Sequence, residues 1–346
     1  VCSSDLGKQG EHGDPAFQGR TPDGAFFTYR ADPARPVPGG HAPWPEAREP
    51  LETPSPGPGL EHSSRAETIM AHPDRYLLAG VMGWPVAHSR SPLIHNHWIQ
   101  QYNLTGAYGA FPVEPSNLEA AIRGIQALGL AGCNITIPHK VNAMAYVDWV
   151  HPLAQRMGAI NTVVVQRDGA LHGFNNDGFG FIQSLLEAQP TWQASASPIV
   201  VLGAGGAARA IIVSLLDAGA TNIRVINRTH SKAEELAQEF GAFVTSVQWQ
   251  NREDALVAAS LLINTTSQGM HREPALDISL TNLPTDAMVF DAVYIPMETP
   301  LLKEARQRGN STVNGLGMLI HQARPAFQAW FGVMPEVTDK LYAEVI

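Results

Sequence analysis

The chain has 346 residues, which suggests about two domains, and its 44% of hydrophobic residues is enough to form buried cores. The formal net charge of -9 argues against a large binding surface for nucleic acid or anionic lipid. Cys2 and Cys133 are too few for a disulfide framework or a zinc site, and they favour a reducing, cytoplasmic compartment. No apolar run reaches the roughly 18 residues that a membrane span needs.

Residues 1–70 differ in composition from the rest of the chain. Between Ala31 and Leu60, 13 of 30 residues are Pro or Gly, and large apolar residues are few. Because burial there cannot offset the entropy lost on ordering, we expect a disordered segment. We interpret it as a non-native extension of a protein whose translation starts at Met70, with a functional linker as the alternative.

From Tyr76 the chain alternates between short apolar runs and helix-forming stretches. Pro92 suits the first turn of a helix, Ser116 is a candidate helix cap, and the segment that ends at Lys140 should lead into a further helix. The alternation predicts a parallel or mixed sheet with helices on its faces. The expected strands cover 76–82, 108–113 and 131–137, and the expected helices cover about 93–102 and 116–128.

The same alternation continues after residue 199. Gly315 and Gly317 should break the chain before a last helical region. The sequence therefore predicts an α/β fold throughout. The expected strands cover 199–202, 222–226, 261–264 and 288–292, and the expected helices cover 207–218, 231–240, 318–330 and about 336–345.

A glycine-rich turn directly follows the expected strand 199–202 and fits the pattern G-x-G-x-x-A. The first glycine permits a tight turn, the second lets the backbone approach a pyrophosphate, and the small last residue lets helix and strand pack closely. A phosphate would meet free N–H groups at the positive end of the helix dipole. The strand before the turn and the helix after it favour dinucleotide binding over a structural turn. The turn consists of Gly203, Ala204, Gly205, Gly206 and Ala207, followed by Ala208.

The end of the next expected strand indicates which dinucleotide binds. An NAD enzyme usually has Asp or Glu there for the ribose hydroxyls. This chain has Asn227, Arg228 and Thr229 instead, with Lys232 one turn into the next helix. The Arg guanidinium can donate two hydrogen bonds to the oxygens of a 2′-phosphate, and Lys adds a second positive charge. The sequence therefore favours NADP. A solvated basic pair is the alternative.

Polar residues follow the expected strands of the first half, and each is ambiguous alone. Alternation puts Asn134 and Thr136 on one face of their strand, and Lys140 lies just past its end, where ligands collect in α/β sheets. The structural alternatives are helix caps for two serines and Asp177, a turn for Asn161 and an exposed surface for Lys140. The full set is Ser89, Ser91, Asn134, Thr136, Lys140, Asn161 and Asp177.

Taken together, these motifs resemble the shikimate dehydrogenase family. The matching segments occur in the family's order and span nearly all of residues 76–330, which is more specific than any one motif. They are GWPVAHSRSP (83–92), NITIPHK (134–140), GAINT (158–162), NNDG (175–178), GAGGAARA (203–210), NRT (227–229), NTTSQGM (264–270), YIPMETPLL (294–302) and GLGMLIHQA (315–323).

The resemblance implies a reaction and residue roles. The reaction would be the reversible NADPH-dependent reduction of 3-dehydroshikimate to shikimate, in chorismate and aromatic amino acid biosynthesis. Lys140 and Asp177 would be the catalytic pair, and Ser89 and Ser91 would hold the substrate carboxylate. Other substrate contacts would come from Thr136, Asn161, Tyr294 and Gln322. The cofactor contacts would be Gly203–Ala207 on the pyrophosphate, Asn227–Lys232 on the 2′-phosphate end, and Ala292 and Gly315 by the nicotinamide.

The resemblance also implies two domains. One is a discontinuous α/β substrate domain with a mainly parallel sheet, residues 71–178 plus 317–346. The other is a doubly wound NADP-binding domain of Rossmann type, residues 179–316. The sequence departs from the family at His151-Pro152, where many relatives have an acidic residue thought to touch the cofactor. Proline offers neither a charge nor an N–H, so that role is not carried over.

Other functions stay open. An NAD-dependent quinate or quinate/shikimate dehydrogenase is the close rival, although the basic pair Arg228 and Lys232 argues against NAD. A non-catalytic NADP-binding regulatory paralogue would not need both members of the catalytic pair. An enzyme of the methylene-tetrahydrofolate dehydrogenase type would not need the serine pair. The expected partner is a small-molecule substrate, with a homodimer as one option for the assembly.

A metal site is not expected. His95 and His97 lie two positions apart in an expected helix, and such residues point about 200° apart. They therefore cannot close on one metal ion.

Overall fold

The computed structural model describes residues 18–20, 26–28, 76–194 and 197–346. The first two stretches are strands β1 (Gln18–Arg20) and β2 (Phe26–Thr28), which pair antiparallel. Most of residues 1–70 lies outside the described residues, so the disorder and the non-native origin of that segment stay predictions. Residues from 76 onward belong to a unit of their own.

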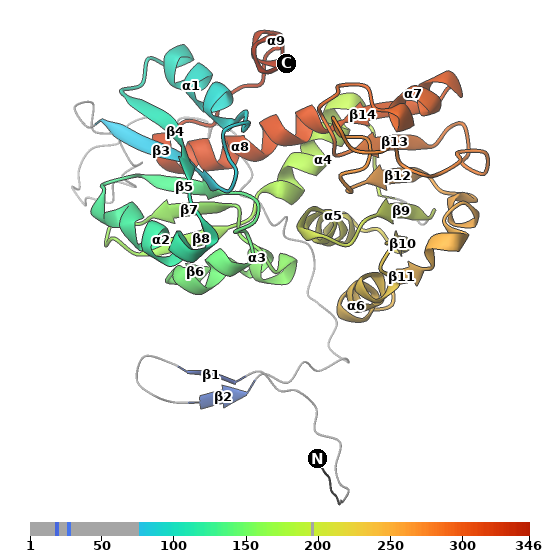
Figure 1. Ribbon diagram of the computed structural model, residues 1–346, viewed down its shortest axis with the longest axis horizontal. Coiled ribbons are helices and arrows are strands. Elements are labelled where there is room, and N and C mark those ends of the chain that lie inside the picture. The colour runs from blue at the N-terminus through green and yellow to red at the C-terminus, as the bar shows by residue number, and fades with distance from the viewer. Residues whose placement is uncertain (1–17, 21–25, 29–75, 195–196) are drawn as a thin grey trace, which may run out of the picture. The chain divides into compact units, whose positions relative to one another are not determined.

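This unit begins with a mixed six-stranded sheet, drawn mostly in blue and green in Figure 1. The strand order is β4-β3-β5-β7-β8-β6. β3 pairs parallel with β4 and β5, β7 lies antiparallel between β5 and β8, and β6 pairs parallel with β8. The strands are β3 (Leu77–Gly83), β4 (Gly106–Pro112), β5 (Gly132–Ile135), β6 (Trp149–Val150), β7 (Thr162–Val165) and β8 (Leu171–Phe174).

The helices of this half follow from apolar spacing and from Pro and Gly positions. In α2 the buried residues are Leu118, Ile122 and Ile125, which are three or four positions apart. Pro92 lies in the first turn of α1, as predicted, and Gly158 ends α3 with a left-handed φ of 67°. The helices are α1 (Ser91–Gln101), α2 (Leu118–Ala127), α3 (Pro152–Met157) and α9 (Asp339–Val345), with 3₁₀ turns η1 (Pro115–Asn117) and η2 (Asn142–Tyr146).

A second six-stranded sheet is parallel throughout, in the order β11-β10-β9-β12-β13-β14. The chain runs outward from β9 to β11 and then returns to the other side of β9 with β12. This reversal is a topological switch point, where open α/β sheets bind ligands. The strands are β9 (Ile199–Leu202), β10 (Ile223–Ile226), β11 (Val244–Val247), β12 (Leu261–Asn264), β13 (Met288–Asp291) and β14 (Ser311–Asn314).

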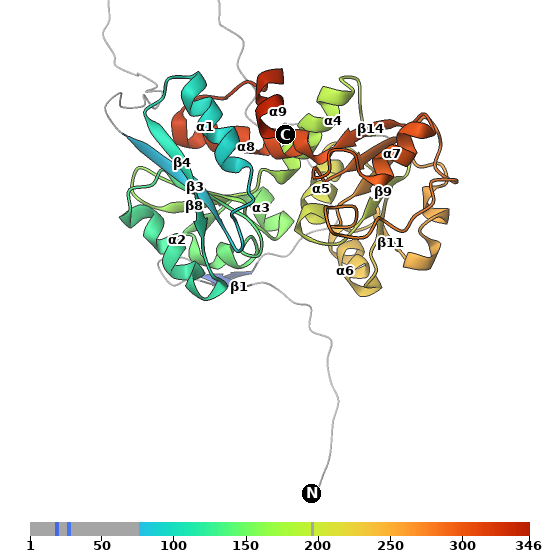
Figure 2. The same cartoon turned by 45° about the horizontal axis from the view of Figure 1, so that its top comes forward.

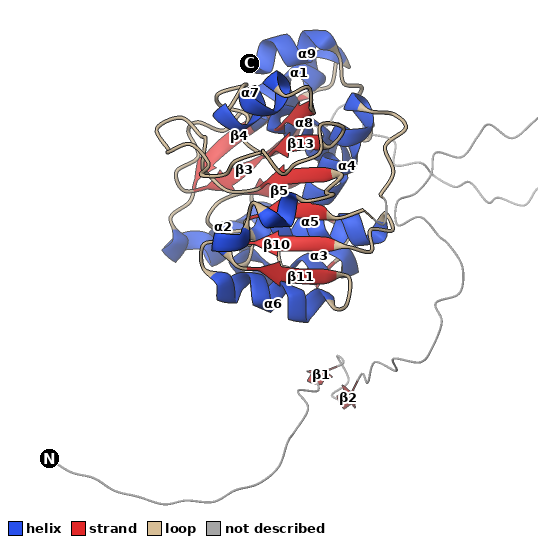
Figure 3. Ribbon diagram, turned by 90° about the vertical axis from the view of Figure 1, so that its right-hand side faces the viewer, coloured by secondary structure: helices blue, strands red, loops and turns tan. Residues whose placement is uncertain are grey.

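Helices cover this second sheet on both faces, and its central strands β9, β12 and β13 are therefore buried along their length. All four residues of β9 are buried, as expected for a central parallel strand. Figure 3 shows α6 beside β10 and β11. The helices are α5 (Gly206–Asp217), α6 (His230–Phe240) and α7 (Pro300–Gln307), with 3₁₀ turns η3 (Trp249–Asn251) and η4 (Asp254–Leu256).

Two further helices, α4 (Asp177–Ala188) and α8 (Gly315–Phe331), join the halves and pack along each other. Figure 2 shows α8 passing between the two sheets. A Cβ at Gly180 would lie 2.5 Å from Met318 O and 2.7 Å from Gln322 Cβ. Because only glycine permits this approach, Gly180 fixes the spacing between the helix that begins at Asp177 and the helix that carries Gln322.

Most expected elements occur within two residues of their predicted bounds, but some local predictions are wrong. Ser116 does not cap α2, because it lies inside the 3₁₀ turn before that helix. Gly315 and Gly317 do not break the chain, because α8 begins at Gly315 and the Asn314 side chain caps it by accepting from Leu316 N. Lys140 leads into a 3₁₀ turn rather than an α-helix. None of the helices in the described ranges has the length and apolar character needed to cross a membrane.

Candidate active site

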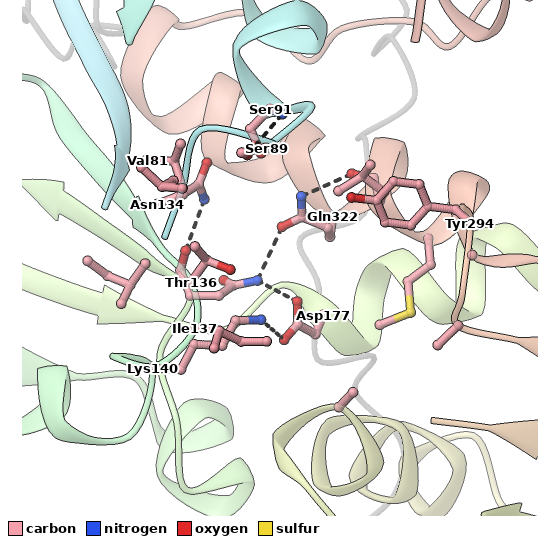
Figure 4. Close-up of a pocket in the computed structure, with 18 of the residues that line it drawn as sticks. Val81, Ser89, Ser91, Asn134, Thr136, Ile137, Lys140, Asp177, Tyr294 and Gln322 are labelled. Carbon is pink, nitrogen blue, oxygen red and sulfur yellow. Dashed lines mark hydrogen bonds and ion pairs between the residues drawn. The ribbon is translucent and has the colours of Figure 1, made fainter. Parts of the chain in front are cut away.

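A cavity of about 330 Å³ lies between the two sheets, and residues at or just beyond strand ends line it (Figure 4). Of the predicted cofactor residues, Ala207, Ala292 and Gly315 line this cavity, whereas 203–206 and 227–232 lie outside its lining. All of the predicted catalytic and substrate-binding residues line it: Lys140, Asp177, Ser89, Ser91, Thr136, Asn161, Tyr294 and Gln322. The fold thus brings together residues from both ends of the unit.

Lys140 and Asp177 form an ion pair in this cavity. Lys140 Nζ donates to Asp177 Oδ2 at 2.6 Å (Figure 4). Asp177 is 6% exposed and is the first residue of α4, yet its carboxylate bonds to Lys140 and Asn161. The carboxylate is therefore directed into the cavity rather than used as a helix cap, and Lys140 is not a solvated surface residue.

Asn161 connects this ion pair to α8. Its Oδ1 accepts from the backbone N–H of Asn176 at 3.0 Å, which settles the orientation of the amide because a backbone N–H can only donate. Asn161 Nδ2 therefore donates to Asp177 Oδ1 at 2.8 Å and to Gln322 Oε1 at 3.2 Å. Gln322 Nε2 donates to Leu319 O at 3.0 Å and keeps a second hydrogen for a ligand. Asn161 is thus part of the site rather than a turn residue.

Ser89 and Ser91 lie away from Lys140 in the same cavity (Figure 4). Ser89 Oγ accepts from Ser91 N at 3.3 Å, and Ser91 is the first residue of α1. The cap position belongs to Arg90, whose side chain makes no capping hydrogen bond within the described chain. Two hydroxyls at a helix N-terminus suit an anionic group such as a carboxylate.

Tyr294 closes the side of the cavity opposite Asn134 and Thr136 in Figure 4. Burial raises the pKa of the Tyr294 hydroxyl, although the positive charge of Arg90 opposes the shift. The hydroxyl is therefore protonated at neutral pH and can donate to a ligand oxygen.

The glycine turn after β9 has room for a pyrophosphate. Gly203 has a φ of 109°, and a Cβ there would lie 2.3 Å from Thr265 Oγ1, so only glycine fits. A Cβ at Gly205 or Gly206 would meet no atom of the described chain within 4 Å. Helix α5 begins at Gly206, and no side chain of the described residues caps its free N–H groups. The exposed backbone of this turn thus fits the phosphate role that the motif predicts.

The basic residues after β10 lack partners within the part of the chain that the structure describes. Arg228 and Lys232 are exposed, and neither forms an ion pair with a described residue. Asn227 Nδ2 donates to Thr229 O at 2.8 Å, which fixes the turn between β10 and α6. Both cations lie near the start of α6, where the helix dipole disfavours positive charge, so this position suits an anionic ligand group.

Asp291 holds the segment that carries Ala292. Its Oδ1 accepts from Asn264 Nδ2 at 2.9 Å, and its Oδ2 accepts from Thr299 Oγ1 at 2.6 Å. Burial raises the pKa of the Asp291 carboxyl, while these hydrogen bonds oppose the shift. A Cβ at Gly315 would lie 2.0 Å from Ala292 O, so the two backbones form one wall of the cavity.

Sequence reasoning left part of the cavity unassigned. Asn134 lines it beside Thr136, and strand alternation had already placed the two residues on one face. Met318 and Leu319 also line it. They precede Gln322 by four and three positions in α8, so helical spacing from Gln322 was the signal that could have found them.

Among the described residues, no group of three or more His, Cys, Asp and Glu could hold a metal ion. His95 is fully buried and stacks on Tyr108 with ring centroids 4.1 Å apart. His97 Nδ1 lies 2.5 Å from Glu344 Oε2 on α9. The two imidazoles thus have different surroundings, as their helical spacing predicts.

Comparison with known proteins decides the family. Models of the shikimate dehydrogenase substrate binding domain, of shikimate / quinate 5-dehydrogenase and of the shikimate 5'-dehydrogenase C-terminal domain match residues 81–163, 186–283 and 315–339. The chain is 49% identical over 269 residues to the shikimate dehydrogenase (NADP(+)) of Paramagnetospirillum magneticum, with 78% of this chain and 98% of that protein covered. The chain belongs to the shikimate dehydrogenase family.

Two further comparisons agree with this family. The shikimate dehydrogenase (NADP(+)) of Rhodospirillum rubrum is 50% identical over 273 residues, with 78% of this chain and 96% of that protein covered. The crystal structure of shikimate 5-dehydrogenase from Thermus thermophilus in complex with NADP(H) and shikimate matches with a TM-score of 0.70 and 36% identity over 78% of this chain and 98% of that chain. The family and the α/β fold predicted from the motifs are confirmed.

The departure from the family pattern at His151-Pro152 has a local structural role. Pro152 is the first residue of α3, and His151 is its N-cap, whose Nδ1 accepts from Leu153 N at 3.1 Å. Neither residue lines the cavity. The imidazole therefore accepts a hydrogen bond from a backbone N–H group in the first turn of α3, which would otherwise lack a partner within the helix.

Proposed function

We propose that the chain catalyses the reversible NADPH-dependent reduction of 3-dehydroshikimate to shikimate, on the route to chorismate and the aromatic amino acids. The observation that carries this proposal is the Lys140–Asp177 ion pair inside a cavity that also holds Ser89 and Ser91. This arrangement suits a small ring that bears a carbonyl and a carboxylate. The cation of Lys140 would bind the carbonyl oxygen, and the hydroxyls of Ser89 and Ser91 would bind the carboxylate. The names of the two bacterial relatives, and the NADP(H) and shikimate in the matching crystal structure, support the same substrate and cofactor.

In this proposal Ser89 and Ser91 bind the substrate carboxylate at the N-terminus of α1. The contacts to ring hydroxyls come from groups whose donors are free in the cavity. One is the protonated Tyr294 hydroxyl, and another is the second Nε2 hydrogen of Gln322. Thr136 and Asn161 also line the cavity and are the other proposed substrate-binding residues, although both amide hydrogens of Asn161 are used within the protein.

We assign NADP to the carboxyl ends of the second sheet, and bound NADPH supplies the hydride. The open backbone at Gly205 and Gly206 supports pyrophosphate binding. Arg228 and Lys232, which form no ion pair with a described residue, support recognition of a 2′-phosphate. The assigned residues are Gly203, Ala204, Gly205, Gly206 and Ala207 for the pyrophosphate, Asn227, Arg228, Thr229 and Lys232 for the adenosine 2′-phosphate, and Ala292 and Gly315 for the nicotinamide.

Hydride addition to the carbonyl carbon moves the π electrons of the C=O bond onto oxygen. A cationic donor at that oxygen stabilises the growing negative charge and can supply the proton. Lys140 takes this role in our proposal, and Asp177 orients its ammonium group at 2.6 Å. In the reverse direction Lys140 accepts the hydroxyl proton of shikimate.

We propose the two sheets as the cores of two domains. The substrate domain comprises residues 71–178 plus 317–346, and the NADP-binding domain comprises residues 179–316. The positions of α4 and α8, which begin at Asp177 and Gly315, support these boundaries. The low cysteine content supports a cytoplasmic location, and a homodimer stays a prediction.

Steady-state assays test the function and its rivals. We expect NADPH oxidation with 3-dehydroshikimate, and NADP reduction with shikimate in the reverse direction. A preference for quinate with NAD would instead identify a quinate dehydrogenase. Tight NADPH binding without turnover of either acid would favour the regulatory paralogue.

A further inference from the structure

Thr162 lies in a buried polar network behind the cavity. It is the first residue of β7, it is 1% exposed, and it does not line the cavity. In the first sheet it lies in register between Asn134 of β5 and Phe174 of β8. The register of three strands therefore brings the Thr162 hydroxyl close to polar groups that are distant in the sequence.

The direction of each hydrogen bond at Thr162 is determined. Asn161 Oδ1 is an acceptor, because the backbone N–H of Asn176 donates to it. The Thr162 hydroxyl, at 2.9 Å, therefore donates to the same oxygen. With its one hydrogen used, Thr162 Oγ1 accepts from Asn134 Nδ2 and from Asn176 Nδ2, both at 3.1 Å. The hydroxyl thus uses its full hydrogen-bonding capacity.

The far end of the network is anchored in the apolar core. Asn134 Oδ1 accepts from the Tyr108 hydroxyl at 2.6 Å. Burial raises the pKa of Tyr108, so this hydroxyl stays protonated and remains a donor. The Tyr108 ring stacks on His95, which lies among Trp98 and Phe327. Asn134 therefore has a fixed orientation when it donates to Thr162.

The near end of the network reaches the proposed catalytic pair. With Oδ1 held by two donors, Asn161 must direct Nδ2 toward Asp177 Oδ1 and Gln322 Oε1. We propose that Thr162 is a positioning residue, whose hydroxyl locks the Asn161 amide and thereby holds Asp177 and Lys140 for proton transfer. This inference rests on the proposed function and adds a residue outside the cavity to it.

A pair of substitutions separates the hydroxyl from the shape of the side chain. Thr162→Val keeps the branched shape, but it removes one donor to Asn161 Oδ1 and leaves two buried amide N–H groups without their acceptor. We expect kcat to fall by about tenfold or more, with KM for NADPH unchanged, because small displacements of a catalytic group are costly. Thr162→Ser keeps the hydroxyl and should restore most of kcat. A wild-type kcat in Thr162→Val, or an equal loss in Thr162→Ser, would overturn the proposal.

Val163→Ala is the matched control for general destabilisation. Val163 is the next residue in β7, is fully buried and points to the opposite face, into the apolar cluster with Ile122 and Cys133. This variant should lower the melting temperature and leave kcat unchanged. A loss of kcat as large as that of Thr162→Val would show that stability alone is responsible, and the positioning role would fail.

Tyr108→Phe tests the same network from its other end if Thr162→Val does not fold. It keeps the ring that stacks on His95 and removes the hydroxyl that donates to Asn134. We expect kcat to fall by about fivefold, the factor that corresponds to one typical hydrogen bond. An unchanged kcat in this variant would overturn the proposal.

Hydrogen exchange of the Asn161 side-chain amide, followed by NMR, provides a readout that needs no turnover. Exchange should be slow in the wild type and in Thr162→Ser, and faster in Thr162→Val. A wild type that does not reduce 3-dehydroshikimate would overturn the proposed function. Equal exchange rates in all three proteins would overturn the positioning role by itself.

Discussion

The ammonium group of Lys140 lies 2.6 Å from a carboxylate oxygen of Asp177 and faces the cavity. Because positioned acid–base catalysis contributes roughly 10²–10⁴-fold to turnover, we expect Lys140→Ala to lower kcat by about that factor. NADPH affinity, measured by fluorescence titration, should not change, since Lys140 lies outside the cofactor turn. Lys340→Ala, at an exposed lysine of α9, is the matched control and should retain full activity. An active Lys140→Ala variant would remove the lysine from the proposed mechanism.

Arg228 and Lys232 are the residues on which the cofactor assignment depends. Removing both cations by Arg228→Ala with Lys232→Ala should raise KM for NADPH by about a hundredfold or more, because each charged hydrogen bond contributes roughly 1.5–3 kcal/mol. KM for NAD should stay the same, since NAD lacks the 2′-phosphate. Kinetics with both cofactors measure the difference, with the exposed Lys303→Ala as control. An equal loss with NADPH and NAD would contradict 2′-phosphate recognition.

At the scale of elements, the buried parallel strands were the most predictable part of the fold. β9 and β12 are buried along their whole length because helices cover both faces of their sheet, and the structure gives both strands the bounds that were predicted. The short antiparallel β8 was not predicted. Helix α4 was also missed, because Gly178 and Gly180 lower its helix propensity. Gly180 is there for its contact with α8, which a local pattern does not reveal.

The same contrast applies to the site. Residues within motifs, such as Lys140 and Asp177, were found because each motif places a polar group at a strand or helix end. Thr162 and Asn176 lie within two of the same motifs, but their roles could not be found in this way. Their hydrogen bonds depend on the register of β5, β7 and β8, which are separate in the sequence.

The contact between α4 and α8 gives a prediction at this scale. Gly180→Ala would place a methyl group 2.5 Å from Met318 O, so we expect it to lower the free energy of unfolding by about 1–3 kcal/mol. KM for the substrate should also rise, since Gln322 lies against the same position. Gly124→Ala, in α2, is the matched control: its Cβ meets no described atom within 4 Å, and it should stabilise the protein by about 0.5–1 kcal/mol. Urea unfolding measures both, and a Gly180→Ala variant as stable as Gly124→Ala would contradict the close approach.

At the scale of the whole molecule, the buried histidine His95 makes the stability of the first half sensitive to acid. His95 is 0% exposed, and its two ring nitrogens have no hydrogen-bond partner among the described residues. Burial lowers the pKa of His95 from 6.5 to about 3. The native state therefore binds fewer protons than the unfolded state between these values. The contribution of His95 to the free energy of unfolding is fully present above its pKa in the unfolded state, 6.5. It is lost as the pH falls toward its pKa in the folded state, about 3.

This shift predicts the size of the acid effect. Between pH 7 and pH 5, His95 alone should lower the free energy of unfolding by about 2 kcal/mol. In His95→Leu this part of the pH dependence should disappear, whereas His271→Gln, at an exposed histidine, should keep the wild-type dependence. Urea unfolding at both pH values gives the comparison. Because His95 packs on Tyr108, its protonation would also disturb the network that ends at Asn161, so acid should reduce activity before the second sheet unfolds. A His95→Leu variant with the wild-type difference between the two pH values would contradict this account.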